Sequence, residues 1–206
     1  MTDKLGKIFG GGSRVKMLRL FLSNPETFFV TEEVSKRTKV YLDLTMKELK
    51  ELFQAGFLKK KPITVEKKIK EKREILIKKV RTVAWRLNPM FDYIEPLNNL
   101  LFGSGILKRG DLVKKLKDSG NLNLVVVAGV FMGDESSRAD LLIVGDDIDK
   151  KILDSVIKNI EAEIGHELRY GVFDTEDYKY RLTVYDKFVR DVLDFPHEKI
   201  LNRLDS

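Results

Sequence analysis

Arg138 and Asp140 stand two positions apart at the start of the apolar run ADLLIVG. Residues i and i+2 of a strand share a face, so two acids at this spacing could hold divalent metal ions together. Such ions bridge phosphate oxygens and neutralise charge during phosphoryl or nucleotidyl transfer. Because arginine replaces one of the acids here, the sequence predicts a hydrogen-bonded Arg138–Asp140 pair and no metal or other cofactor.

A glycine-bounded loop precedes this pair. Gly129 and Gly133 flank a turn, and Val130 follows the first glycine, where a serine hydroxyl could hold a phosphate. The later strand ELRYGVF presents Arg169 on the face opposite its apolar residues and adds no acid there. Glu167 is the nearest acid and is poorly placed. The sequence therefore predicts an incomplete catalytic set, with no catalytic residue.

The remaining candidates for acid, base or metal chemistry have structural interpretations. Asp147 and Asp149 have metal-like spacing, but they precede a helix, where acids cap the first turn. His166 and His197 lie far apart, and we expect single surface imidazoles. His197 and Glu198 follow a proline and are interpreted as a surface turn.

The composition is that of a globular protein. The chain has 206 residues, 43% of them hydrophobic, which is enough for one large domain or two small ones. It has no apolar run of the ~20 residues that cross a bilayer, and the N-terminus lacks the apolar core of a secretion signal. Cysteine is absent. We therefore expect a soluble cytoplasmic protein that makes no membrane contact.

Positive charge is concentrated in residues 57–86. This stretch has 12 Lys and Arg against 3 Glu, a balance of +9, which leaves −3 for the rest of a chain whose net charge is +6. Clustered cations favour a polyanion because they displace counterions from phosphates. Two alternatives stay open. The lysines could serve only to keep an edge hairpin from pairing with other chains, or the polyanion could be RNA, because lysine clusters do not distinguish DNA from RNA.

Three helices and a hairpin are expected to position these cations. Ser13 and Thr31 are predicted to cap the first two helices, and the third is expected from Asp43 to Ala55. Apolar residues at helical spacing define the predicted inner face of the third helix: Leu44, Leu49, Leu52 and Phe53. Alternating residues then predict two strands between Phe57 and Leu87, turning around 66–73.

This order of elements resembles the winged helix-turn-helix DNA-binding domains. The stretches VYLDLTMKELKELFQAGFLKK and TVAWRLNP carry the resemblance, over roughly residues 13–90 of a domain expected at 1–90. It implies that the third helix enters the major groove while the hairpin, as the wing, grips the backbone. We expect double-stranded DNA to contact Tyr41, Thr45, Lys47, Lys50, Lys59, Lys60, Lys61, Lys67, Lys68, Lys70, Lys72, Arg73, Lys78, Lys79 and Arg81.

The second half alternates strands and helices. After a connecting helix and linker at 91–105, we expect a small mixed-sheet α/β domain at 106–206. One long amphipathic helix is predicted over 176–193, with Tyr180, Val184, Phe188 and Val192 on its apolar face.

Residues 106–204 resemble the minimal nucleotidyltransferase fold of the DNA-polymerase-β-like superfamily. The resemblance assigns degenerate motif positions to Gly129, Val130, Gly133, Arg138 and Asp140. The whole sequence therefore predicts a two-domain protein, α+β then α/β, that regulates transcription with a catalytically inactive second domain. That domain could form a homodimer, dock a protein partner or bind a nucleotide. The alternatives are an active metal-dependent nucleotidyltransferase with the winged helix as substrate handle, and an antitoxin-type neutralising protein.

Overall fold

The computed structural model has a mixed α/β fold, and its described residues form nine α-helices and two sheets. The chain divides into two compact units. The N-terminal unit comprises residues 1–101 with 162–166, and the C-terminal unit comprises 102–161 with 167–206. None of the helices described is both long and apolar enough to cross a membrane. The structure describes residues 4–71, 74–102, 109–134 and 137–204.

Five helices belong to the N-terminal unit: α1 Lys4–Ile8, α2 Gly12–Ser23, α3 Thr31–Thr38, α4 Leu42–Gln54 and α5 Ile94–Phe102. Helices are thus present where the sequence predicts them. Their packed interior is apolar, because burying such side chains is the main favourable contribution to folding. The buried residues include Met17, Phe21, Phe29, Val34, Leu49, Leu52, Phe57 and Leu87.

The two predicted caps of this unit are wrong. Helix α2 begins at Gly12, before Ser13, and its N-cap position is Gly11, which makes no side-chain capping bond. Helix α3 begins at Thr31 itself, and the Thr31 hydroxyl instead accepts a hydrogen bond from Trp85 Nε1 at 3.1 Å. The Thr31 hydroxyl oxygen therefore bonds to Trp85, on a strand distant in the sequence, and not to a backbone N–H of its own helix.

The inner face of α4 is also rotated from the predicted one. Leu49 and Leu52 are buried as expected, but Leu44 and Phe53 are more than one third exposed. Glu48 is buried in their place, and Arg14 Nε of α2 lies 2.6 Å from its Oε2. This ion pair allows a charged residue on the packed face, since a buried carboxylate needs a compensating partner.

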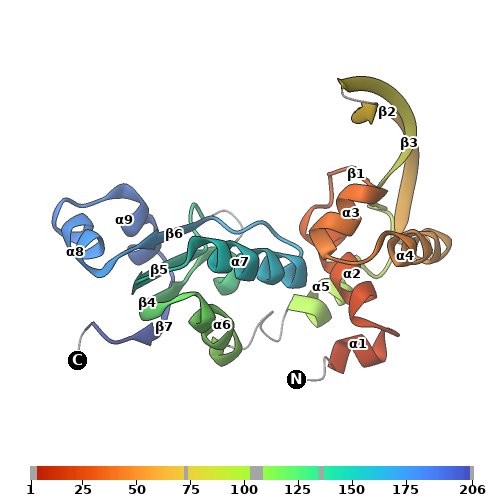
Figure 1. The fold of residues 1–206 in the computed structure, drawn as a ribbon. Helices are drawn as coiled ribbons and strands as arrows, with labels where there is room; N and C mark the ends of the chain where they lie inside the picture. Colours follow the sequence, from red (N-terminus) through yellow and green to blue (C-terminus); the bar gives the residue numbers. More distant parts are fainter. Residues whose placement is uncertain (1–3, 72–73, 103–108, 135–136, 205–206) are drawn as a thin grey trace. The chain divides into compact units, whose positions relative to one another are not determined.

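The predicted hairpin is present and is longer than expected. Strands β2 Leu58–Glu71 and β3 Glu74–Leu87 pair antiparallel from Leu58↔Leu87 to Glu71↔Glu74. At about 3.3 Å per residue, 14 residues span about 46 Å. A short strand that the sequence did not predict, β1 Phe29–Val30, pairs with β3 and gives the order β1-β3-β2. Figure 1 shows the hairpin as a curved ribbon that extends beyond the helices of its unit.

A four-stranded sheet organises the C-terminal unit. Its strands, β4 Asn121–Val127, β5 Leu141–Asp146, β6 Tyr170–Phe173 and β7 Glu198–Asn202, lie in the order β6-β5-β4-β7. Only the β5–β6 pair is parallel. The helices of the unit are α6 Arg109–Leu116, most of α7 Lys150–Ile164, α8 Thr175–Thr183 and α9 Lys187–Leu193 (Figure 1). One core cluster joins this sheet to α8 and α9 through Val126, Leu142, Val144, Tyr178, Val189 and Val192.

Two predictions for the end of the chain are wrong. Glu198 begins strand β7 and pairs with Val127 of β4, so it does not lie in a surface turn. The helix expected over 176–193 is broken into α8 and α9. Tyr185 lies between them in the left-handed region, with φ 55°, and Asp186 caps α9 by accepting a bond from Val189 N. The break leaves Tyr180 and Val184 exposed, contrary to the predicted apolar face.

Candidate functional site

The exposed surface of α4, with its N-cap residue, carries three of the four residues that were predicted to contact DNA from this helix. Tyr41, at the N-cap position, is 89% exposed, and Lys47 and Lys50 are exposed on the helix. Met46 is 43% exposed beside them. This surface therefore offers a phenol, two ammonium groups and a thioether to an external partner.

Thr45 does not belong to that surface, which corrects the sequence prediction. Its side chain is fully buried, and its hydroxyl lies 3.1 Å from the carbonyl oxygen of Tyr41 and 3.3 Å from that of Val40. The residue satisfies the backbone at the start of α4. It therefore contributes to the helix-to-helix turn and not to an external contact.

We expect Thr45→Val to lower the free energy of unfolding by about 1 kcal/mol, the usual net contribution of one hydrogen bond. Urea unfolding followed by circular dichroism measures this change. The DNA binding that the sequence predicts should stay unchanged in the same variant, whereas exposed Lys47→Gln should weaken it. A loss of DNA affinity in Thr45→Val without a loss of stability would contradict the structural role assigned to Thr45 and support a direct contact with DNA.

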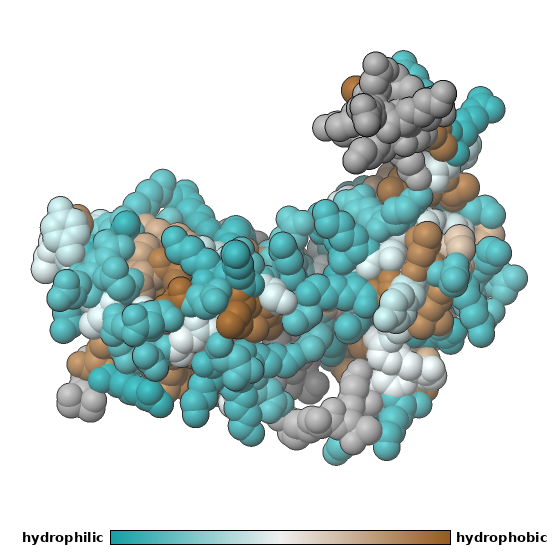
Figure 2. All heavy atoms as spheres, in the orientation of Figure 1, coloured by the Kyte–Doolittle hydropathy of each residue, from teal (hydrophilic) through white to brown (hydrophobic). Residues whose placement is uncertain are grey.

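The hairpin, from its base to the Glu66↔Lys79 pair, holds described cations in two environments. Lys59, Lys79 and Arg81 are exposed along β2 and β3. Lys60 and Lys61 are exposed as well, but their ammonium groups lie over aromatic rings, 4.4 Å from the Phe53 centroid and 3.7 Å from the Phe28 centroid. Such cation–π contacts hold a charge at the surface without neutralising it. In Figure 2, hydrophilic and apolar residues are interleaved on the visible face of this region.

The other predicted cations lie further along the hairpin. The β2 backbone includes Lys67, Lys68 and Lys70, and the register places Lys67 opposite Lys78, itself exposed on β3. Two further predicted contacts, Lys72 and Arg73, fall outside the described residues.

A second site lies at one end of the C-terminal sheet, around Asp140. Asp140 directly precedes β5, is fully buried and receives four N–H donors. Val130 N and Arg169 Nη2 lie 3.0 and 3.3 Å from its Oδ1, and Arg169 N and Nε lie 2.9 and 3.0 Å from its Oδ2. One carboxylate thus joins the turn after β4, the start of β5 and the start of β6.

The partner of Asp140 is Arg169, which corrects the predicted Arg138–Asp140 pair. Arg138 is exposed in the loop before β5. The strand begins only at Leu141, so positions 138 and 140 do not share a strand face. The sequence did contain a signal for this partner, because the strand ELRYGVF carries a cation, Arg169, on its polar face, where it can pair with a buried acid.

The preceding turn is shaped around this carboxylate. Gly129 has φ +49°, and a Cβ there would lie 2.2 Å from Asp140 Oδ1. Its neighbour Val130 contributes a backbone N–H, and its side chain takes no part in these bonds. Gly133 ends the short 3₁₀ turn of residues 129–132 with φ +79°. The predicted turn glycines are thus at the turn, where positive φ favours glycine.

These residues do not fit the divalent metals that the resemblance implies. A carboxylate has about four lone-pair sites, and four N–H groups occupy those of Asp140. The Arg169 guanidinium would also repel a second cation. Of the other acids considered from the sequence, Glu167 is exposed, and Asp149, which follows the far end of β5, caps α7 as predicted by accepting from Lys151 N at 2.8 Å. Across the described ranges, no three His, Cys, Asp or Glu side chains form a group that could hold a metal ion.

A third polar cluster connects β4, β5 and α8. Asp146, at the end of β5, accepts bonds from Thr175 N at 3.1 Å, Thr175 Oγ1 at 3.0 Å and Asn123 Nδ2 at 2.8 Å. The bonds from the Thr175 backbone and then its hydroxyl lower the pKa of Asp146, and Asn123 and the charge of Lys179 act in the same direction. The cluster therefore favours the ionised carboxylate.

Thr175→Val removes the hydroxyl bond but keeps the backbone bond, so we expect the pKa of Asp146 to rise towards its ordinary value. A carboxyl titration followed by NMR measures the rise. Because the folded-state pKa is lowered, the stabilisation is present above the unfolded pKa of about 3.9 and is lost as the pH falls through the folded value. The variant should therefore differ from the parent at neutral pH and converge with it in acid. An unchanged pKa would contradict the assigned cause.

The two main sites thus differ in chemistry: the hairpin and α4 expose cations, whereas the sheet end holds a buried carboxylate whose acceptor sites are occupied, paired with a half-exposed guanidinium. Comparisons with protein-family models, with curated proteins and with solved structures found no match to this chain.

Proposed function

We propose that this chain is a DNA-binding transcriptional regulator whose N-terminal unit is a winged helix-turn-helix domain. The observation that carries the proposal is the set of exposed cations on the hairpin, with Lys79 and Arg81 on one face and Lys59 on the other. The base of this hairpin contacts α4, where Lys60 lies over the Phe53 ring. Clustered cations on a projecting element bind phosphates by releasing counterions.

The connection between α3 and α4 supports this assignment. Lys39 lies in the left-handed region with φ 52°, and the chain re-enters a helix at Leu42. The Ser35 hydroxyl bonds to the carbonyl oxygen of Val40 at 2.7 Å and fixes the turn. A short, fixed turn between two helices presents the second one to the major groove.

The two DNA-facing elements have different tasks in this proposal. Tyr41, Lys47 and Lys50 of α4 face base edges or nearby phosphates, while the hairpin contributes sequence-independent affinity. Asp43, also exposed on α4, repels phosphate and limits the affinity of the helix alone. Most of the binding free energy then comes from the hairpin.

For the C-terminal unit, we propose a nucleotidyltransferase-like domain without catalytic activity. The bonds between Asp140 and Arg169 support this, because they occupy the carboxylate that metal-dependent transfer would need. We place the protein in the cytoplasm, with DNA as its polyanionic partner.

Gel shifts of the full chain on random-sequence duplex DNA at rising salt test both parts of the proposal. The logarithm of the binding constant should fall linearly with the logarithm of salt, by about 0.9 per phosphate contact. Nucleoside triphosphate and Mg²⁺, added in parallel, should not be turned over. Absence of binding at low salt would contradict the regulator. Mg²⁺-dependent turnover that Asp140→Asn abolishes would support the enzyme instead.

A further inference from the structure

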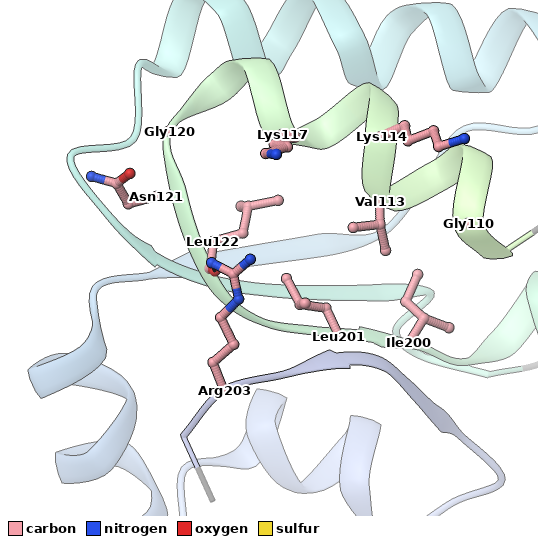
Figure 3. Close-up of a pocket in the computed structure, with 10 residues that line it drawn as sticks. All are labelled: Gly110, Val113, Lys114, Lys117, Gly120, Asn121, Leu122, Ile200, Leu201 and Arg203. Atoms are coloured by element: carbon pink, nitrogen blue, oxygen red, sulfur yellow. Dashed lines mark hydrogen bonds between the residues drawn. The ribbon is translucent and has the colours of Figure 1, made fainter. Parts of the chain in front are cut away.

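A pocket of about 470 Å³ lies between α6 and strands β4 and β7 of the C-terminal unit. It does not include the Asp140 site. Its volume is in the range of small-molecule sites, roughly 300–1,000 Å³. Figure 3 shows Val113, Ile200 and Leu201 directed into the same space between the helix and the sheet.

The floor of the pocket is aliphatic and depends on a bulge in β7. Val125 of β4 pairs with Leu201 and Val126 pairs with Lys199, so the register skips Ile200. Successive residues of a regular strand face opposite sides, but a bulge turns the chain locally. As a result Ile200 and Leu201 both line the pocket, together with Leu122 of β4.

The mouth of the pocket is cationic. Lys114 and Lys117 come from α6 and the turn after it, and Arg203 follows β7. Arg203 Nη1 lies 3.4 Å from the carbonyl oxygen of Leu122, and its backbone N–H bonds to Asn123 O, which places the guanidinium beside the floor (Figure 3). No carboxylate is among the described lining residues. The pocket therefore combines an apolar interior with an electropositive rim.

We propose that this pocket binds a small organic anion with an aliphatic tail, its charged head between Lys117 and Arg203 and its tail on Leu122, Ile200 and Leu201. Charge complementarity selects an anionic head, and the aliphatic floor gains from an alkyl body. The described lining includes no aromatic side chain on which a nucleobase could stack, so an alkyl anion fits better than a nucleotide.

Isothermal titration of the full chain with octanoate tests the proposal. Hexanoate and heptanoate complete a length series, octan-1-ol removes the charge, and octyl phosphate distinguishes a phosphate head from a carboxylate head. Each added methylene should strengthen binding about fourfold. Octan-1-ol should bind at least about tenfold more weakly than octanoate, because it cannot pair with the rim cations.

The double variant Lys117→Gln, Arg203→Gln should weaken octanoate binding about tenfold and leave octan-1-ol unchanged. The double variant Lys151→Gln, Lys158→Gln, which removes two exposed cations of α7, is the matched charge control and should bind octanoate like the parent. Equal binding of octanoate and octan-1-ol, no dependence on chain length, or no octanoate binding at millimolar concentration would overturn the proposal. These titrations contain no DNA, so their failure would leave the DNA-binding proposal intact.

Discussion

Replacing Arg169 with methionine is expected to lower the free energy of unfolding by about 2 kcal/mol, the usual contribution of hydrogen bonds to a charged group. The variant leaves Asp140, which is fully buried, with only the backbone N–H groups of Val130 and Arg169 as donors. Removing Arg169 is costly because it leaves an uncompensated charge on the buried carboxylate of Asp140, although the Arg169 side chain itself is 41% exposed. Urea unfolding followed by circular dichroism measures the loss.

Arg138→Met is the matched control for this experiment. Arg138 is exposed, so the same substitution should change the stability by less than about 0.5 kcal/mol. In the double variant Asp140→Asn, Arg169→Met, the loss should be smaller than the sum of the two single losses, because the charge is removed together with its partner. Equal losses for Arg138→Met and Arg169→Met would contradict the assigned pair.

Neutralising the hairpin with Lys59→Gln, Lys79→Gln and Arg81→Gln together is expected to weaken DNA binding about 100-fold near 0.15 M salt. Three lost phosphate contacts should also reduce the slope of log K against log salt by about 2.7. The loss should be similar on all DNA sequences, since phosphate contacts carry no base information. Fluorescence anisotropy with labelled duplexes at several salt concentrations measures both quantities.

The charge-matched control lies on α7, where Lys150→Gln, Lys151→Gln and Lys158→Gln remove three exposed cations. Both triple variants have the same net charge, so a general electrostatic effect would weaken DNA binding equally in the two. We expect the α7 variant to keep the parent's slope within about 0.5. Equal slopes of log K against log salt in the two variants would contradict a DNA contact by the hairpin, whatever the affinity of the parent.

Local pattern alone was enough to predict most of the elements. Helical spacing located α2, α3 and α4, and alternation located the hairpin between Leu58 and Leu87. Charge counting likewise found the cations of residues 57–86, most of which the structure leaves exposed where it describes them. These features could be predicted because they depend only on residues that are close in the sequence, such as the spacing of apolar residues or a run of like charges.

Orientation within elements could not be read in this way. The sequence prediction placed Thr45 outside and Phe53 inside α4, because apolar residues were assumed to face inward. Thr45 is buried because backbone carbonyls satisfy its hydroxyl, and Lys60 covers the ring of Phe53. Which face of α4 is buried therefore depends on hydrogen-bonding and charged partners that only the tertiary structure brings into contact.

The sequence by itself determined where charge is concentrated and that an arginine stands where a metal-binding acid would be needed. Only the tertiary structure decided that Asp140 bonds to Arg169, 29 positions away, and that a bulge at Ile200 opens a pocket beneath α6. The physical reason is the same in both cases. Strand order and register bring distant residues into contact, and neither is encoded in the spacing of neighbours along the chain.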